Sequence, residues 1–303
     1  MKILFMGGHE LGKLTLEFLV DKGENIVGVV MPDTDGDWYK GVDEVAKNNN
    51  IPFYKENNIN RKGFVEKVKD INPDLITVVN FPQILKREII NLPKKGCINT
   101  HASLLPKYRG RAPLNWAMIN GEDKTGVTVH YIDEEIDTGD IILQKEIEIS
   151  KDDYIKDLLS KVKNMYPEIV SNAVELIKKD KVELTPQKPS EGFYCGKRTP
   201  EDGQINWNKS AEEIYNLIRA VSDPYPGAYS YIDDKKILIW EAELIETNSK
   251  QYNKAEPGEI IDKSKEGYIV KTMDSLLEIK NLEFIEKGVE INIGDRFEYK
   301  EEK

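Results

Sequence analysis

The chain has 303 residues, of which 39% are hydrophobic and 32% are charged, so it is long enough for two domains with apolar cores. Its formal net charge of −11 argues against a general affinity for nucleic acid, because phosphate binding depends on basic surface. Cys97 and Cys195 lack metal-ligand spacing, and no segment approaches the roughly 20 apolar residues of a membrane span. We therefore expect a cytoplasmic protein with reduced thiols and no membrane insertion.

The first part of the chain, up to about residue 185, alternates strand-like and helix-like segments. Five short apolar runs are typical of buried strands: residues 2–6, 26–31, 51–54, 75–79 and 96–101. Apolar residues at helical spacing fill the intervals, which predicts a parallel sheet with helices on both faces. Ligands bind such sheets beyond the carboxyl ends of the strands, where His101 lies.

A hairpin and a second domain are expected farther along. The runs 125–132 and 141–149 alternate like strands, and a long helix is predicted from about 154 to 179, with Ser150 and Asp153 as its capping box. Residues 184–203 hold three prolines and three glycines without a sustained period, which predicts a linker. Beyond it, Ser210-x-x-Glu213 opens a helix, and five short strand candidates indicate a small antiparallel barrel.

These signals divide the chain into an α/β domain at residues 1–185, a linker at 186–203 and a C-terminal domain at 204–303. A dinucleotide site in the first domain is disfavoured. The glycine-rich start, GGHELG, does not follow the GxGxxG pattern, and no acid is cleanly placed at a strand end about twenty residues on.

Asn99 and His101 are two residues apart at the end of a predicted buried strand, so their side chains project from one face. An amide N–H can hold a developing oxyanion, and an imidazole can carry a proton near neutral pH, so the pair suits acyl transfer. A structural role for the histidine is the competing interpretation, and the residues alone leave both open.

Two neighbouring features are also ambiguous. Arg109 and Arg111 flank a glycine, which suits an anion clamp and equally suits two solvated arginines. The loop DEEIDTGD at 133–140 holds five carboxylates, and three interpretations compete: a solvated turn, a divalent-metal site, or one carboxylate aimed at His101. Its register lacks the alternate ligands of a calcium loop, so we expect no metal, but spacing does not select a carboxylate.

Three motifs together resemble the signature of the folate-dependent formyltransferases: Asn99-Thr-His101, Ser103-Leu-Leu-Pro106 with Arg109-Gly110, and Asp137-Thr-Gly139-Asp140. The resemblance extends over nearly the whole chain. It implies a Rossmann-like, parallel-sheet formyltransferase domain that binds folate, followed by a small β-rich, OB-like barrel domain. It also implies that Asn99, His101 and Asp137 are the catalytic set, which selects Asp137 from its acidic neighbours.

The resemblance implies N10-formyltetrahydrofolate as the formyl donor, used as a co-substrate, and it implies no metal. The family's folate contacts map onto one residue group here: Gln83, Ile84, Leu85, Arg111, Asp133, Glu134, Glu135, Ile136 and Asp137.

Within the family, the segments PKYRGRAPLNWAMINGE, CGKRTPEDG and AVSDPYPGAYSY resemble sugar N-formyltransferases. An example is the formyltransferase domain of the bifunctional polymyxin-resistance protein, which formylates UDP-4-amino-4-deoxy-L-arabinose. The implied acceptor is therefore the amine of a nucleotide-linked amino sugar. Its expected contacts are Lys197, Arg198, Thr199 and Tyr225.

Two alternatives are kept. Methionyl-tRNA formyltransferases carry a basic insertion after the second strand, whereas residues 31–50 here hold five acids and two lysines, so this function is placed second and no nucleic-acid partner is expected. A folate or nucleotide-sugar binding module without catalysis is the non-enzyme alternative, and the complete Asn–His–Asp set argues against it. The oligomeric state is open, with a homodimer as one option.

Overall fold

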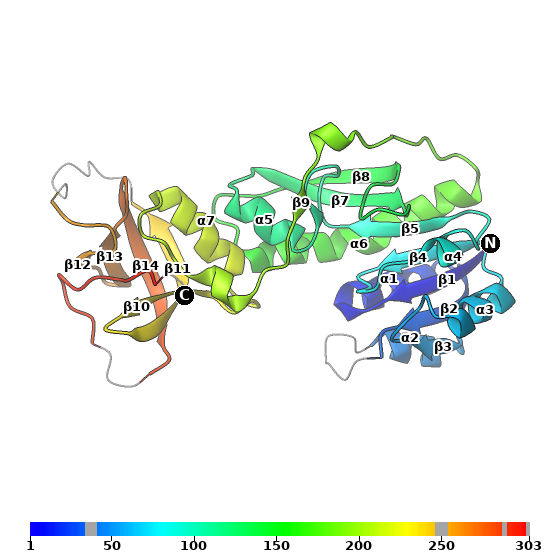
Figure 1. Cartoon of the computed structure of the whole chain (residues 1–303), viewed down its shortest axis with the longest axis horizontal. Coiled ribbons are helices and arrows are strands. Elements are labelled where there is room, and N and C mark those ends of the chain that lie inside the picture. Colours follow the sequence, from blue (N-terminus) through cyan, green and yellow to red (C-terminus); the bar gives the residue numbers. More distant parts are fainter. Residues whose placement is uncertain (34–40, 246–253, 287–289, 301–303) are drawn as a thin grey trace. The chain divides into compact units, whose positions relative to one another are not determined.

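The computed structural model describes residues 1–33, 41–245, 254–286 and 290–300, and the chain divides into two compact units (Figure 1). The first unit comprises Met1–Pro113, Thr125–Glu148 and Ser160–Cys195. The second comprises Leu114–Lys124, Ile149–Leu159 and Gly196–Lys303. Two short segments that precede the predicted linker therefore group with the second unit.

The first unit is built on a seven-stranded sheet with the order β3-β2-β1-β4-β5-β7-β8. The strands are β1 Lys2–Gly7, β2 Asn25–Met31, β3 Phe53–Lys55, β4 Leu75–Val79, β5 Cys97–His101, β7 Lys124–Tyr131 and β8 Ile141–Glu148. Strands β1 to β5 pair in parallel, whereas β7 runs antiparallel to β5. The predicted α/β class with a mostly parallel sheet is confirmed.

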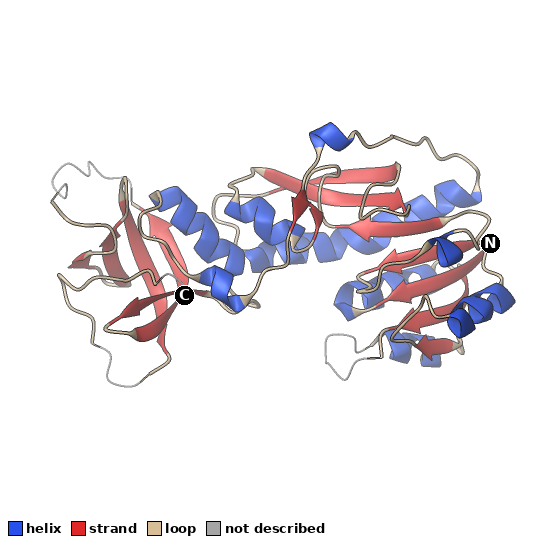
Figure 2. Ribbon diagram, in the orientation of Figure 1, coloured by secondary structure: helices blue, strands red, loops and turns tan. Residues whose placement is uncertain are grey.

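Helices alternate with these strands along the chain (Figure 2): α1 His9–Asp21, α2 Val42–Asn48, α3 Lys62–Ile71 and α4 Arg87–Ile90. Gly23, at φ +76°, follows α1 in the left-handed conformation that glycine commonly supplies after a helix. Helix α4 is short, and the backbone before it is bound by Asn60. Its Nδ2 donates to the carbonyl of Ile84 at 2.8 Å, and its Oδ1 accepts from the N–H of Lys86 at 2.9 Å.

A hydrophobic cluster holds the central strands of the first sheet together. It thereby also holds the strand ends at which the polar loops begin. It joins β1, β2 and β4 to α3, and its fully buried members include Leu4, Met6, Val30, Ile76, Phe64 and Val68. The strands supply side chains from runs that are apolar at nearly every position, as a sheet buried in an α/β unit requires. The loop ends are therefore held on a rigid base.

A two-stranded sheet and two further helices complete the elements that precede the C-terminal part of the chain. A small parallel sheet joins β6 Arg109–Gly110 to β9 Tyr194–Cys195. Short helix α5 spans Pro113–Ile119, and α6 spans Ile155–Lys178. The expected capping box at Ser150 is wrong by about one turn: Asp153 closes a separate turn with Ser150, and Tyr154 and Asp157 form the contact that precedes α6. Within the described ranges, no helix is long and apolar enough to cross a membrane.

The second unit contains α7 Ala211–Val221, whose predicted capping box between Ser210 and Glu213 is confirmed. It also contains a five-stranded antiparallel sheet of order β10-β11-β14-β13-β12. The strands are β10 Ala228–Ile232, β11 Lys235–Leu244, β12 Ile260–Lys263, β13 Gly267–Lys271 and β14 Leu276–Phe284. Residues 296–298 bridge both Tyr231 on β10 and Glu259 beside β12, so one segment links the two edges of the sheet.

Candidate active site

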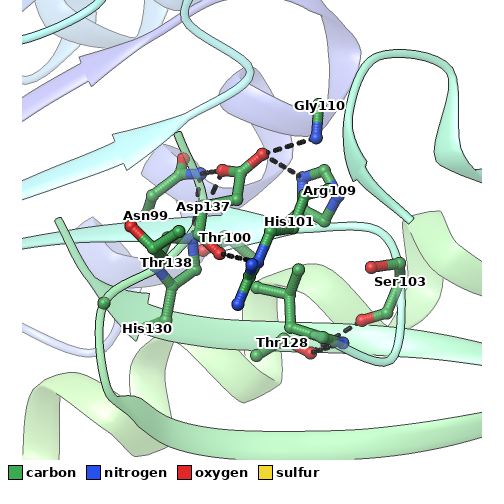
Figure 3. A network of polar contacts seen from close by, with 12 residues as sticks. Asn99, Thr100, His101, Ser103, Arg109, Gly110, Thr128, His130, Asp137 and Thr138 are labelled. Atoms are coloured by element: carbon green, nitrogen blue, oxygen red, sulfur yellow. Dashed lines mark hydrogen bonds and ion pairs between the residues drawn. The ribbon is translucent and has the colours of Figure 1, made fainter. Parts of the chain in front are cut away.

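The carboxyl end of β5 carries two of the predicted catalytic side chains (Figure 3). Asn99 and His101 share a face of the strand, as their spacing predicts. Strand β7 lies beside β5 in a register that sets Asn99 opposite His130 and His101 opposite Thr128. One face of this strand pair therefore presents an amide and two imidazoles together.

The loop between β7 and β8 returns Asp137 to the same face. Its Oδ2 lies 3.5 Å from Nδ1 of His101, and its Oδ1 lies 3.6 Å from Nε2 of His130. Oδ2 accepts a hydrogen bond from the backbone N–H of Gly110 at 2.9 Å, and Oδ1 accepts a longer one from Nδ2 of Asn99 at 3.3 Å. The three side chains predicted as the catalytic set are thus brought together, and His130 joins them.

Burial and these contacts set the charges of the site. Burial acts to raise the pKa of Asp137, but the contacts with His130, His101 and the Gly110 N–H outweigh it and lower the pKa to about 2. The pKa of His101 lies below its ordinary 6.5, mainly because burial disfavours the charged ring, although Asp137 acts to raise it. At neutral pH an ionised carboxylate therefore faces a mostly neutral imidazole.

The tautomer of His101 follows from its other contact. Its Nε2 lies 2.8 Å from the carbonyl oxygen of Tyr108, which can only accept, so Nε2 carries the hydrogen and Nδ1 presents its lone pair toward Asp137. The loop that supplies this carbonyl is held by Thr128, whose hydroxyl donates to the carbonyl of Ser103 at 2.7 Å and accepts from Nε2 of Gln144 at 2.8 Å. The two ring nitrogens of His101 therefore face different partners, Nε2 the carbonyl of Tyr108 and Nδ1 the carboxylate of Asp137.

The two arginines of the loop have different surroundings. Arg109 is 3% exposed, and its Nε donates to the carbonyl of Asp137 at 3.1 Å while its Nη2 donates to Oε1 of Gln187 at 2.8 Å. Arg111 is exposed, and its backbone N–H donates to the carbonyl of Cys195 at 3.0 Å. Arg109 therefore supports the loop that carries Asp137 from within the protein, and Arg111 is accessible to a ligand.

Apart from Arg111, which follows β6, the predicted folate contacts lie on two loops of the first unit, one after β4 and one between β7 and β8. The loops meet where Nε of Arg87 donates to Oε1 of Glu134 at 2.6 Å. Ile84 and Ile136 are 62% and 46% exposed, whereas Leu85 is buried. The pair of loops thus presents apolar side chains on an otherwise polar surface.

Some of these predicted contacts are already engaged within the protein. The amide of Gln83 accepts from and donates to backbone groups of residues 56–59, at 2.9 and 2.6 Å. Asp133 accepts from the hydroxyl of Thr138 at 2.6 Å and from the N–H of Glu135 at 3.2 Å. Both side chains shape their loops.

In the part of the chain that the structure describes, no cluster of three or more His, Cys, Asp or Glu residues could hold a metal ion.

The four predicted acceptor contacts belong to the second unit: Lys197, Arg198, Thr199 and Tyr225. Arg198 lies over the ring of Trp116, with 4.9 Å from Cζ to the ring centroid, and donates to the carbonyl of Asp202 at 2.7 Å. The N–H of Thr199 donates to the Asp202 carboxylate at 2.5 Å. Arg198 and Thr199 therefore have contacts inside their own unit, and the predicted catalytic set belongs to the other unit.

His130 is the member of this cluster that the sequence did not predict. It is 2% exposed, its Nδ1 lies 2.7 Å from the carbonyl of Tyr131, and its Nε2 lies 3.4 Å from Nδ2 of Asn99. The indication in the sequence was that His130 is one of only three histidines and lies on a predicted strand. The sequence does not show which strand pairs with which, so the meeting with Asn99 was not visible.

The sequence matches the formyl transferase family over residues 3–174 and the formyl transferase C-terminal domain over residues 197–292. The chain belongs to the formyl transferase family. This formyltransferase is 40% identical over 296 residues to the methionyl-tRNA formyltransferase of Clostridioides difficile (strain 630), covering 95% of this chain and 93% of the relative. It is 40% identical over 286 residues to that of Thermodesulfovibrio yellowstonii, covering 91% and 89%.

Solved structures support the fold at lower identity. An N-formyltransferase from Helicobacter canadensis, in complex with folinic acid and dTDP-3-aminofucose, superposes with a TM-score of 0.74 and 22% identity, covering 93% of this formyltransferase and all of that chain. The sugar 3N-formyl transferase WlaRD, with dTDP and 5-N-formyl-THF, gives 0.70 and 23%, covering 92% and 97%. At these identities the comparison establishes the architecture alone.

The acceptor predicted from the sequence is wrong. Six curated relatives, 34–40% identical, are all methionyl-tRNA formyltransferases, which overturns the nucleotide-linked amino sugar and the expectation of no nucleic-acid partner. The net charge is a poor guide to nucleic-acid binding, because it averages over the whole surface, whereas the contacts with phosphate groups are local. The acidic segment 31–50 was the second reason for placing tRNA formylation below sugar formylation. Its residues 34–40 lie outside the described residues.

Proposed function

We propose that this formyltransferase transfers a formyl group to the α-amino group of methionyl-tRNA. The observation that carries the proposal is the set of six methionyl-tRNA formyltransferases that match 91–95% of the chain at 34–40% identity. The match includes both the catalytic sheet and the C-terminal domain, so it is not limited to the motifs that all formyltransferases share.

The proposed donor is N10-formyltetrahydrofolate, acting as a co-substrate. Two of the structurally similar enzymes were solved with 5-N-formyl-THF or folinic acid. In this chain, the loops joined by Arg87 and Glu134 suit a flat ring system, because Ile84 and Ile136 offer apolar contacts beside backbone and polar groups. Those loops hold most of the residues that the family resemblance assigns to folate.

Asn99 is proposed to stabilise the tetrahedral intermediate. The neutral amine of the methionyl group attacks the formyl carbon, a new N–C bond forms, and negative charge develops on the formyl oxygen. The N–H groups of Asn99 make contacts of 3.3 and 3.4 Å with Asp137 and His130, which are long for hydrogen bonds. Little is lost when one N–H turns to the oxyanion, whose stabilisation is often the largest catalytic contribution.

His101 is proposed to move the proton. Its Nδ1 presents a lone pair in the neutral ring and accepts the proton of the attacking amine. The imidazolium that forms lies 3.5 Å from the carboxylate of Asp137, whose ionised state stabilises it. The same proton then passes to the folate nitrogen as its bond to the formyl carbon breaks, so the site ends in its starting protonation state.

The test is a transfer assay with purified protein, methionyl-tRNA and N10-formyltetrahydrofolate. After hydrolysis of the ester bond, mass spectrometry of the released amino acid should show methionine with one added formyl group, formed only when both the protein and the donor are present. Free methionine without the added mass, in a reaction where the folded protein binds the donor, would reject the proposed function.

A further inference from the structure

Part of the segment predicted as a linker, residues 187–195, is bound to β6 and to the loop that carries Asp137. Strand β9 pairs with β6, and the N–H groups of Arg109 and Arg111 donate to the carbonyls of Phe193 and Cys195, both at 3.0 Å. Between these two bonds lies Gly110, whose N–H binds the Asp137 carboxylate. The segment therefore holds the backbone that presents this N–H.

The amide of Gln187 makes the second attachment, directly at Asp137. Its Nε2 donates to the carbonyl of Asp137 at 3.0 Å and to the carbonyl of Gly139 at 2.8 Å. Its Oε1 accepts from Nε and Nη2 of Arg109 at 3.2 and 2.8 Å. One side chain thus binds the backbone at Asp137 and two residues beyond it.

Arg109 determines which way this amide points. Its buried guanidinium has donors and no acceptor, so it requires the oxygen of Gln187 on its side, and the –NH₂ group must face the two carbonyls. The opposite orientation would place –NH₂ against the guanidinium and leave two carbonyls facing an oxygen. The ring of Tyr194 lies on the guanidinium, with 5.7 Å from Cζ to its centroid, and adds a cation–π contact.

Asp137 needs such support because its backbone is in the left-handed region, at φ 55°, which is uncommon for a residue with a side chain. The orientation of its carboxylate toward His101 depends on that conformation. We propose that Gln187, oriented by Arg109, is a positioning residue for Asp137, and that the backbone of residues 193–195 holds the Gly110 N–H in place. The inference deepens the proposed function, because it rests on the role of Asp137 in formyl transfer.

Two variants separate positioning from stability. Gln187→Leu removes every hydrogen bond of the amide without adding charge. Gln187→Glu keeps the acceptor for Arg109 but sets an oxygen against the two carbonyls. We expect both to lower kcat for methionyl-tRNA formylation by roughly ten- to a hundredfold, with KM changed less than about twofold, because misplacement of a catalytic group mainly affects the reacting geometry. Lys188→Ala, exposed and paired with Glu191, is the matched control and should match the wild type.

The NMR titration of His101 supplies a readout that needs no turnover. Because Asp137 acts to raise the pKa of His101, its displacement in Gln187→Leu should move the titration to lower pH. A wild-type titration in Gln187→Leu, or a Gln187→Glu variant with wild-type kcat, would overturn the positioning role. Absence of methionyl-tRNA formylation by the wild-type protein would instead count against the proposed function, and the titration would still report on Asp137.

Discussion

Asn99 on β5 and His130 on β7 lie directly opposite each other in the antiparallel strand pair, with 3.4 Å between Nδ2 and Nε2. Nδ1 of His130 faces the carbonyl of Tyr131 at 2.7 Å and carries the hydrogen in the neutral ring, so Nε2 is available as an acceptor for the Asn99 amide. The group proposed to receive the oxyanion is therefore aimed by a side chain from a neighbouring strand and by Asp137 together.

Replacing Asn99 by Ala should remove the proposed oxyanion donor. We expect kcat to fall by about 10²–10³ with a small change in KM, because a donor of this kind acts on the transition state more than on bound substrate. Steady-state kinetics with methionyl-tRNA as the varied substrate measure both constants. A rate within about threefold of the wild type would show that Asn99 has no such role.

Replacing His130 by Leu should leave Asn99 and Asp137 in place but less well oriented. A loss of roughly tenfold in kcat is expected, corresponding to one hydrogen bond of ordinary strength. His130→Gln offers an amide acceptor on a side chain of similar reach and should recover part of the loss. Equal rates in the Leu and Gln variants, both folded by circular dichroism, would argue against an orienting role.

The pKa of His101 should fall further when Asp137 is replaced by Asn. In the wild type, burial holds this pKa below 6.5 while the carboxylate acts to raise it, so removal of the carboxylate leaves the effect of burial less opposed. The imidazolium persists only to lower pH in the variant. NMR titration of the three histidine rings, assigned with single variants, measures the shift, and a pKa that rises or stays constant in Asp137→Asn contradicts the assignment.

Gly110 should be sensitive to substitution for two reasons. Its φ is +92°, and a Cβ would lie 2.6 Å from the carbonyl oxygen of Cys195. Gly110→Ala is therefore expected to destabilise the protein by roughly 2–3 kcal/mol and to lower kcat, since the N–H bound to Asp137 must shift.

Gly23→Ala is the matched control, because Gly23 has φ +76° and nothing within 4 Å of the added Cβ. It should cost about 1 kcal/mol, the conformational term alone, and leave kcat unchanged. Thermal unfolding and initial rates distinguish the two variants. If both variants lost similar stability and Gly110→Ala kept full activity, the short distance between residue 110 and the Cys195 carbonyl would not constrain the site.

Much of the first sheet could be predicted because its strands are short apolar runs and its helices have the apolar period and stop signals of buried amphipathic elements. The shared face of Asn99 and His101 followed from their spacing alone. The choice of Asp137 required the family signature, since several carboxylates in one loop have equivalent spacing. The structure shows what distinguishes it: a left-handed backbone and an N–H donor from Gly110.

Two parts of the site could not be predicted, for different physical reasons. His130 reaches Asn99 through the pairing of β5 with β7, a long-range contact that leaves no local pattern. Gln187 acts through backbone carbonyls, which every residue has, so its partners are invisible in the sequence and its segment was interpreted as a linker. The acceptor was predicted wrongly because it rested on segments that resemble sugar N-formyltransferases and on whole-chain charge, which does not describe the few residues that touch a substrate.

The most direct test of the central claim is a comparison of acceptors. Wild-type protein and N10-formyltetrahydrofolate are supplied with methionyl-tRNA in one reaction and with a nucleotide-linked amino sugar in a parallel one, and kcat/KM for formyl incorporation is measured for each. We predict a kcat/KM at least about a hundredfold greater for methionyl-tRNA, because discrimination between acceptors depends on transition-state binding. Formylation of the amino sugar with unmodified methionyl-tRNA would contradict the account.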